Sequence, residues 1–500
     1  MGDAANILVV SDLHFGEELL PGASLERRQA VELGAAAFRD FLRYHAVRRS
    51  GGRPWRLVIA GDLFDFMSVV IPARPAPGER APADERRFGV GRTTAAGVER
   101  MRLIAELHAP LLAEMVRFAA AGHRIDIVVG NHDVELLAPE VAAELMRHLA
   151  FANPDPKVVD PTAPPTGGAS RPARGALERI AIVPWFVYVP GVAWIEHGHV
   201  YDEGCSFEFN LAPTDPADGV LVFNADYAAV RYLGTAVPEI DPHGIEEWSF
   251  WGFMQYSWGQ GLRSFGKLWV AYARFSGALF AARRLHRSLK RRHRRQMAHR
   301  TRLARVAADG GLALDHAERI DHLARSPMTY SFRRLGRMVM LDRFGLVGGA
   351  LLVAVLGLVL LPRIAAWIVV ALAIAAVIGV SRWLGQHHVT SQIPMRSIPQ
   401  RLRGIVDAPV VVFGHTHDPR WQVLRDQGLY VNAGTWLPAT RPGLRRSFTH
   451  VLIVPRAEGR PVVELRQWRD GSSMPFDAGA NLGAGGMTDP HIDISSLKHL

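Results

Sequence analysis

Five short polar motifs in this sequence each follow a run of β-branched and other apolar residues. In chain order they read SDLH, GDLFD, GNHD, HGH and GHTH. They contain carboxylate, imidazole and carboxamide side chains that bind metals: Asp12, His14, Asp62, Asn131, His197, His415 and His417. Oxygen and nitrogen donors without a thiolate suit Mn²⁺, Fe²⁺/Fe³⁺, Zn²⁺ or Mg²⁺ better than they suit a structural zinc site. The residue types therefore predict a catalytic metal site.

The number of candidate ligands exceeds what one small cation needs. We therefore expect two metal ions that share a carboxylate. Two metals about 3.5–4 Å apart can hold both the attacking and the leaving oxygen of a phosphoryl transfer. In GHTH, His415 and His417 are two residues apart, so on a loop after a strand they can face two different metals.

The apolar runs before the motifs predict the elements that must position them. NILVV, RLVIA, RIDIVV, VAWIE and VVVF each have the length and the β-branched composition of a buried strand. Ligand-type side chains then follow the carboxyl end of each strand, which is where open α/β sheets form their sites. We therefore expect an α/β fold in which the five motifs meet at one edge.

The five motifs in this order resemble those of the calcineurin-like metallophosphoesterase superfamily. The resemblance covers residues 6–202 and 410–436, and YVNAGTW at Tyr430–Trp436 resembles the strand that follows the last motif in that family. It implies a four-layer α/β/β/α sandwich. GDLFDF, GNHD and HGHVYD look most like the branch that contains UDP-2,3-diacylglucosamine pyrophosphatase, although that branch commonly has arginine where His132 stands.

The resemblance also implies how the metal ligands divide. It implies three ligands for a first metal, three for a second and one bridging carboxylate: Asp12, His14 and His417; Asn131, His197 and His415; and Asp62. The expected nucleophile is a hydroxide that bridges the metals. For the second metal we choose His197 over His199 of the same HGH motif, because His197 directly ends the strand.

Three further residues receive roles from the same resemblance. His132 would act as a general acid or stabilise the transition state near the leaving oxygen. Asp65 and Asp133 would orient the ligands or His132.

The middle of the chain predicts an insertion into this sandwich. Residues 203–405 lie between the fourth and fifth motifs and are expected to be mostly helical. The sandwich would then comprise residues 1–202 and 406–470. Residues 471–500 are rich in glycine and predict a tail without regular structure.

An apolar stretch, residues 345–380, lies inside the insertion and is interrupted only by Pro362 and Arg363. Each half would form a helix about 24–26 Å long, slightly short of the ~30 Å hydrocarbon core of a membrane. A single span would separate GNHD and GHTH by a membrane, so we predict a hairpin whose ends share one side. The sequence leaves open whether the hairpin crosses the bilayer or only enters it. Two buried helices of a soluble core are the alternative.

Positive charge is concentrated in the same insertion. The net charge is +10, and fourteen Lys and Arg without any acidic residue lie between residues 263 and 305, so the remainder carries −4. This segment, with the Trp and Tyr residues before it, predicts a basic amphipathic helix that lies on anionic lipid. The alternative is a solvated helix face with core aromatics. Nucleic acid is disfavoured, because no nucleic-acid-binding module accompanies the segment.

Arginines lie on both sides of the apolar stretch: Arg333, Arg334, Arg337 and Arg343 before it, and Arg382 after it. Basic flanks are typical of cytoplasmic ends. The N-terminus lacks the basic and apolar regions of a cleaved signal peptide, and the single cysteine, Cys205, excludes an intrachain disulfide. We therefore expect a catalytic domain on the cytoplasmic side of the inner or plasma membrane.

Together these features predict a dinuclear-metal-dependent hydrolase of phosphoester or pyrophosphate bonds that acts at a membrane surface on an amphiphilic, lipid-linked substrate. Mn²⁺ is the preferred metal, with Fe, Zn²⁺ and Mg²⁺ as alternatives. Two other functions stay open. One is a membrane-anchored phosphodiesterase or phosphatase for soluble nucleotides or phosphoproteins. The other is a non-catalytic membrane scaffold that retains the metal site.

Overall fold

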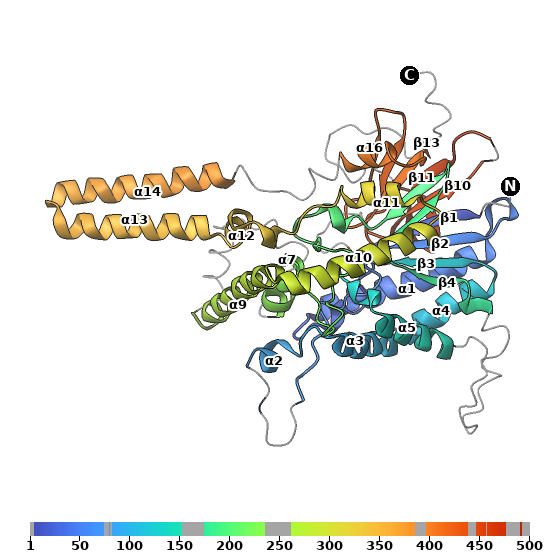
Figure 1. Cartoon of the computed structure of the whole chain (residues 1–500), viewed down its shortest axis with the longest axis horizontal. Coiled ribbons are helices and arrows are strands. Elements are labelled where there is room, and N and C mark those ends of the chain that lie inside the picture. The colour runs from blue at the N-terminus through green and yellow to red at the C-terminus, as the bar shows by residue number, and fades with distance from the viewer. Residues whose placement is uncertain are drawn as a thin grey trace.

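The computed structural model describes residues 5–74, 80, 83–152, 175–235, 262–385, 397–438, 447–456, 458–476 and 491–492. These residues form a mixed α/β fold with two β-sheets, from which a pair of helices projects (Figure 1). The first sheet has the strand order β12-β11-β10-β1-β2-β3-β4, with β13 beside β11, and the second has the order β5-β6-β7-β9-β8.

The first sheet combines a parallel and an antiparallel half. The parallel strands are β1 (Asn6–Val10), β2 (Trp55–Ala60), β3 (Arg124–Val128) and β4 (Ile180–Val183). The antiparallel strands are β10 (Thr449–Val454), β11 (Val462–Arg469), β12 (Ser472–Pro475) and β13 (His491–Ile492). β1 thus joins the first part of the chain to its last part.

The C-terminal end differs from the sequence prediction. Regular structure does not end at residue 470, because Asp470 and Gly471 form a two-residue hairpin turn and β12 pairs with β11. Both turn residues have positive φ, at 51° and 71°, which suits the twist of a hairpin. Residues 477–490 and 493–500 of the predicted tail lie outside the described residues.

The second sheet joins strands from both sides of the insertion. It consists of β5 (Phe186–Val189), β6 (Ala193–Glu196), β7 (Val410–Phe413), β8 (Arg420–Val423) and β9 (Leu429–Asn432). β6 precedes the insertion and β7 follows it, yet the two pair in parallel with Ile195 opposite Val412. Their carboxyl ends therefore lie at the same edge of the sheet.

Apolar side chains fill the space between the two sheets and cover their outer faces. The cluster between the sheets includes Val9 and Val58 of the first sheet and Ile195 and Val412 of the second. Helices α1 (Leu25–Val47), α3 (Thr94–Leu107), α4 (Ala109–Ala120) and α5 (Pro139–Phe151) pack in a second cluster with β1, β2 and β3. Helices α10 (Leu289–Asp309), α11 (Leu314–Asp321) and α16 (Ile398–Arg403) pack in a third with β6, β7 and β9.

The insertion begins with α7 (Ala225–Ala229) and η5 (Val230–Gly234) and continues with α9 (Leu262–His286) and α12 (Phe332–Met338). These elements share one apolar cluster, in which Ala228 and Tyr232 meet Phe275 and Leu335. These four elements of the insertion therefore pack together, whereas its helices α10, α11 and α16 cover the second sheet.

The predicted basic segment forms two helices, α9 and α10, rather than one amphipathic helix. The arginines of α10 bind carboxylates of the same chain: Arg292 and Arg295 pair with Glu208, and Arg291 and Arg294 with Asp215. Four of the fourteen basic side chains of the segment are therefore held by two carboxylates of the protein, which the sequence did not reveal. The aromatic residues Trp251, Tyr256 and Trp258, which we expected beside this segment, lie outside the described residues.

The apolar stretch forms a helical hairpin, α13 (Leu341–Leu360) and α14 (Arg363–Gly385), which projects from the body of the protein (Figure 1). The two helices turn back at Leu361–Pro362, one residue before the predicted turn at Pro362–Arg363, and Gly357 allows close approach to Val369. Only 11% of the most apolar 18-residue stretch of either helix is buried, so the alternative of two helices in a soluble core is wrong.

Both hairpin helices are long and apolar enough to cross a membrane. α13 has 20 residues and α14 has 23, which correspond to about 30 and 34 Å. They are longer than predicted from the apolar runs alone, because each helix continues into the polar residues at the foot of the hairpin. Arg363 is exposed at the turn.

Candidate metal centre

The structure brings the five motifs together from both sheets. Each follows the carboxyl end of a strand, in the order β1 (Asp12 and His14), β2 (Asp62), β3 (Asn131), β6 (His197) and β7 (His415 and His417). Parallel pairing of β1 with β2, β2 with β3 and β6 with β7 directs these ends the same way. The motifs thus come from three strands of the first sheet and two strands of the second, rather than from one edge of a single sheet as expected.

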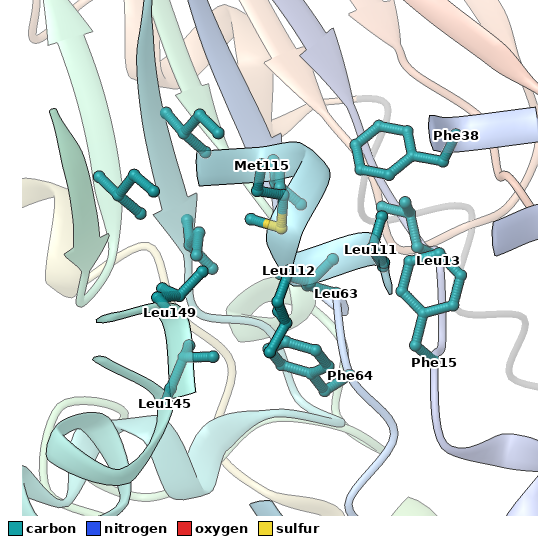
Figure 2. Close-up of a cluster of buried hydrophobic side chains, with 14 of the residues drawn as sticks. Leu13, Phe15, Phe38, Leu63, Phe64, Leu111, Leu112, Met115, Leu145 and Leu149 are labelled. Carbon is teal, nitrogen blue, oxygen red and sulfur yellow. The ribbon is translucent and has the colours of Figure 1, made fainter. Parts of the chain in front are cut away.

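Leucines between the polar residues attach two of the loops to the core. Leu13 lies between Asp12 and His14, and Leu63 follows Asp62. Figure 2 shows both leucines among the buried side chains of α1, α4 and α5. Their burial holds the loops in place while the polar neighbours form the site.

Unfavourable backbone geometry is concentrated at the predicted ligands. Nine residues other than glycine have positive φ in the described part of the chain. Five of them are predicted ligands: Asp12, His14, Asp62, His415 and His417, with φ between 51° and 68°. Left-handed backbone costs residues with a Cβ about 1–2 kcal/mol each. Such strain is typical of functional sites, where the surrounding fold maintains it.

Asp12, His14 and His417 form a compact donor group. The Nε2 atoms of His14 and His417 are 3.2 Å apart, and Asp12 Oδ1 lies 3.0 Å from His417 Nε2 and 3.8 Å from His14 Nε2. All donor atoms of this group lie within 4.8 Å of one another. These are the three residues that we predicted for the first metal.

Asp62 lies between this group and the residues predicted for a second metal. Its Oδ2 atom is 3.8 Å from His14 Nε2 and 3.1 Å from His197 Nε2. His197 Nε2 is also 2.9 Å from Asn131 Oδ1. The carboxylate of Asp62 is therefore within reach of both groups, which is the position that a bridging ligand requires.

His415 departs from the predicted arrangement. Its ring centroid lies 5.2 Å from that of His197, but its Nε2 atom faces Asp202 Oδ2 at 3.1 Å. Asp202, His415 and Cys205 form a separate donor group. Sequence analysis missed Asp202, and the available signal was its place at the end of HGHVYD, five residues after His197. His199 belongs to no donor group among the described residues.

His132 lies between two carboxylates. Its Nδ1 atom is 3.1 Å from Asp65 Oδ1, and its Nε2 atom is 3.3 Å from Asp226 Oδ2. Ser68 fixes Asp65 by donating from Oγ to Oδ2 at 2.5 Å. The contact between Asp65 and His132 has the geometry of a carboxylate that orients an imidazole. Burial alone would lower the pKa of His132, but Asp65 and Asp226 raise it well above its ordinary value.

Asp133 holds two motifs together through the backbone. Its carboxylate accepts hydrogen bonds from the N–H groups of Leu63 and Gly130, at 2.8 and 2.6 Å. Burial and the neighbouring charge of Asp62 raise the pKa of Asp133 to about 7. Asp133 therefore positions the GDLFD loop against GNHD rather than contacting His132 itself.

Asp226 is a site residue that the sequence did not reveal. It lies on α7, in the insertion, and its Oδ2 atom accepts a hydrogen bond from Asn131 Nδ2 at 2.8 Å. A carboxylate only accepts, so this contact fixes which end of the Asn131 carboxamide faces it. Asn131 Oδ1 is thereby turned toward His197 and the metal ligands. The sequence around Asp226 has no strand-end motif that would have identified it.

The electrostatics of the cluster favour a cation. Burial would raise the pKa of Asp62, but the charges of His197 and His132 keep it well below its ordinary value. Burial would lower the pKa of His197, but Asp62 and Asp12 raise it to about 9. A metal that binds such a site competes with protons for the histidine nitrogens.

Two motif glycines permit the close approach of the loops. A Cβ atom at Gly130 would overlap the carboxylate of Asp62, and one at Gly414 would overlap Ser11 Oγ and crowd Asp12 Oδ2. Carboxylate, imidazole and carboxamide donors without a thiolate are a suitable set for a divalent cation. The buried His and Asp clusters therefore fit a metal ion.

Neither protein-family models nor curated proteins match this chain. The functional argument therefore rests on the motifs and on the geometry of the site.

Replacing Asp226 by alanine is expected to lower the affinity for Mn²⁺ by about 10- to 100-fold, because Asn131 loses the acceptor that orients it. Isothermal titration of Mn²⁺ into the purified protein measures this change. Asp218→Ala, which removes an exposed aspartate that pairs with Arg291, is the matched control and should leave the affinity unchanged. Equal Mn²⁺ affinity of Asp226→Ala and wild-type protein would contradict the role of Asp226.

Proposed function

We propose that this protein is a dinuclear-metal-dependent hydrolase of phosphoester or pyrophosphate bonds that acts at a membrane surface on an amphiphilic substrate. The observation that carries the proposal is the position of Asp62 between the donor group of Asp12, His14 and His417 and the pair formed by His197 and Asn131. A shared carboxylate between two sets of nitrogen and oxygen donors suits two divalent cations.

The resemblance to the calcineurin-like metallophosphoesterases supports the same function. Two sheets that share an apolar cluster, with helices packed on both outer faces, agree with the four-layer sandwich of that family. The order of the five motifs and the strand-end position of each agree with it too.

The residues of the site suit hydrolysis of a phosphorus–oxygen bond. When bound, the metals would supply Lewis acidity and a nucleophilic water at neutral pH. His132, oriented by Asp65, itself forms a donor group with His14 and Asp62, and its ring centroid is 4.6 Å from that of His14. In this proposal its imidazolium form donates a proton to the leaving oxygen. No residue of the chain is needed as a covalent nucleophile.

The hairpin supports a location at a membrane. Its exposed apolar helices would be hydrophobic surface in water, whereas a bilayer would bury them. The second sheet joins β6 and β7 from either side of the insertion, so both ends of the hairpin belong on one side. A lipid-linked phosphoester or pyrophosphate could keep its tails in the bilayer while its phosphate reaches the metals. UDP-2,3-diacylglucosamine is the first such substrate to test.

Cleavage of a substrate panel by the detergent-purified protein with Mn²⁺ tests this function. The panel contains UDP-2,3-diacylglucosamine, other lipid pyrophosphates, phospholipids, and water-soluble diesters and nucleotides. Preferential release of phosphate products from an acylated substrate is the expected result. Equal or better cleavage of soluble substrates would contradict the lipid-substrate part of the proposal and favour a membrane-anchored phosphodiesterase. No cleavage of any member by the Mn²⁺-loaded protein would favour a non-catalytic scaffold.

A further inference from the structure

Three arginines near the end of α9 line a concavity at the foot of the hairpin. Arg283, Arg284 and Arg287, with Phe280 and Phe332, enclose a volume of about 390 Å³. Phe280 and Arg284 lie on one face of α9, Arg287 follows the last residue of that helix, and Phe332 begins α12 on the opposite wall. The two phenylalanine rings are 6.1 Å apart. The concavity therefore combines a cationic rim with apolar walls.

These arginines differ from those of α10 in what they bind. Four arginines of α10, at positions 291, 292, 294 and 295, pair with Glu208 and Asp215, as described above. Arg283 instead donates to the backbone carbonyls of Thr329 and Tyr330, which fixes its guanidinium. Arg284 and Arg287 are exposed and have no carboxylate partner within the described part of the chain. The positive charge of this concavity therefore remains available to an anion from outside the protein.

The position of the concavity indicates the source of that anion. α12 leads through Met340, which has a φ of 50°, directly into α13 of the hairpin. α9 runs beside this connection, where Tyr272 donates to the Val339 carbonyl and Trp269 lies 5.3 Å from Phe344. Arg333 and Arg337 on α12 add two more exposed cations. In Figure 1, α12 lies at the foot of the hairpin, between it and the body of the protein.

We propose that this concavity binds the headgroup of an anionic phospholipid. Arginine guanidinium groups bind phosphate oxygens through paired hydrogen bonds, and the phenylalanine walls suit the glycerol backbone and the upper acyl chains. A volume of about 390 Å³ is in the range of small-ligand sites. The inference rests on the membrane location in the proposed function but not on its hydrolytic chemistry.

Native mass spectrometry of the detergent-solubilised, full-length protein tests the site. The protein is titrated with dioleoyl phosphatidylglycerol and, separately, with dioleoyl phosphatidylcholine. The wild-type protein should bind phosphatidylglycerol more tightly. Arg284→Gln with Arg287→Gln should weaken phosphatidylglycerol binding by about 30-fold, because two charges are removed, and leave phosphatidylcholine binding unchanged.

The matched control is Arg300→Gln with Arg305→Gln, which removes the same charge from exposed positions of α10. It should keep the preference for phosphatidylglycerol. Equal binding of both lipids by the wild-type protein, or an unchanged preference in the Arg284 and Arg287 variant, would overturn the inference. Displacement of phosphatidylglycerol by millimolar inorganic phosphate would also overturn it, in favour of a soluble phosphate ligand. Because no turnover is measured, failure here is distinguishable from failure of the hydrolase proposal.

Discussion

Replacement of Asp62 by asparagine is expected to lower Mn²⁺-dependent hydrolysis by at least about a thousandfold. Asp62 Oδ1 accepts from the backbone N–H of His132 at 2.9 Å, and Oδ2 faces His197 Nε2 at 3.1 Å. A carboxamide has one acceptor oxygen, so it can satisfy only one of these contacts and presents an NH₂ group to the other. It also lacks the charge that a carboxylate shared between two cations supplies.

Two measurements check this expectation. Initial rates on the best substrate give the loss of activity, and the number of Mn²⁺ ions bound per chain shows whether the metal site is lost with it. Asp40→Asn is the matched control, because Asp40 is exposed on α1 and pairs only with Arg43 among the described residues. Wild-type rates for Asp62→Asn would contradict the assignment of two metals that share this carboxylate.

Four lysines in the middle of the hairpin are expected to release the protein from membranes. The changes are Leu351→Lys, Leu352→Lys, Leu372→Lys and Ile374→Lys, at side chains that are 55–64% exposed and face away from the partner helix. A lysine at the centre of a membrane-spanning helix costs about 2.5–3.5 kcal/mol, so four of them cost roughly 10 kcal/mol. Sedimentation of vesicles measures the shift of the protein from pellet to supernatant.

The control places lysines at exposed apolar positions on the body of the protein: Leu25→Lys, Val47→Lys, Phe151→Lys and Leu289→Lys. This variant should stay with the vesicles, because these positions lie outside the hairpin. Hydrolysis of soluble substrates by the hairpin variant should persist, since the metal ligands lie on other elements. If the hairpin variant remained in the pellet after a high-salt wash, the hairpin would not be the membrane anchor.

The strands and most residues of the candidate metal site were predictable because each depends on local sequence. A buried strand needs a run such as NILVV, and the loop after it presents Asp12 and His14, so one short segment specifies both. The hairpin was predictable for the same reason, since its apolar composition is continuous. Its true length was not, because α13 and α14 extend beyond the apolar run into polar residues.

Contacts between distant segments account for what the sequence did not reveal. Asp226 reaches Asn131 from α7, 95 residues further along the chain, and Asp202 reaches His415 across 213 residues. Neither the hydrophobic periodicity of the sequence nor the spacing of its motifs indicates such contacts. The arginines of α10 illustrate the same limit. A run of basic residues has the same sequence whether its side chains face lipid or pair with Glu208.

Because β6 pairs with β7, the second sheet can be completed only late in the synthesis of the protein. His197 and His415 are 218 residues apart, and the whole hairpin is made between them. At about 5–20 residues per second, a ribosome needs roughly 10–40 s to cover that distance. During this time β6 lacks its partner strand β7, and the site lacks His415 and His417. The whole hairpin is therefore made before His415 and His417, and the donor groups of the candidate site can be complete only after the hairpin has left the ribosome.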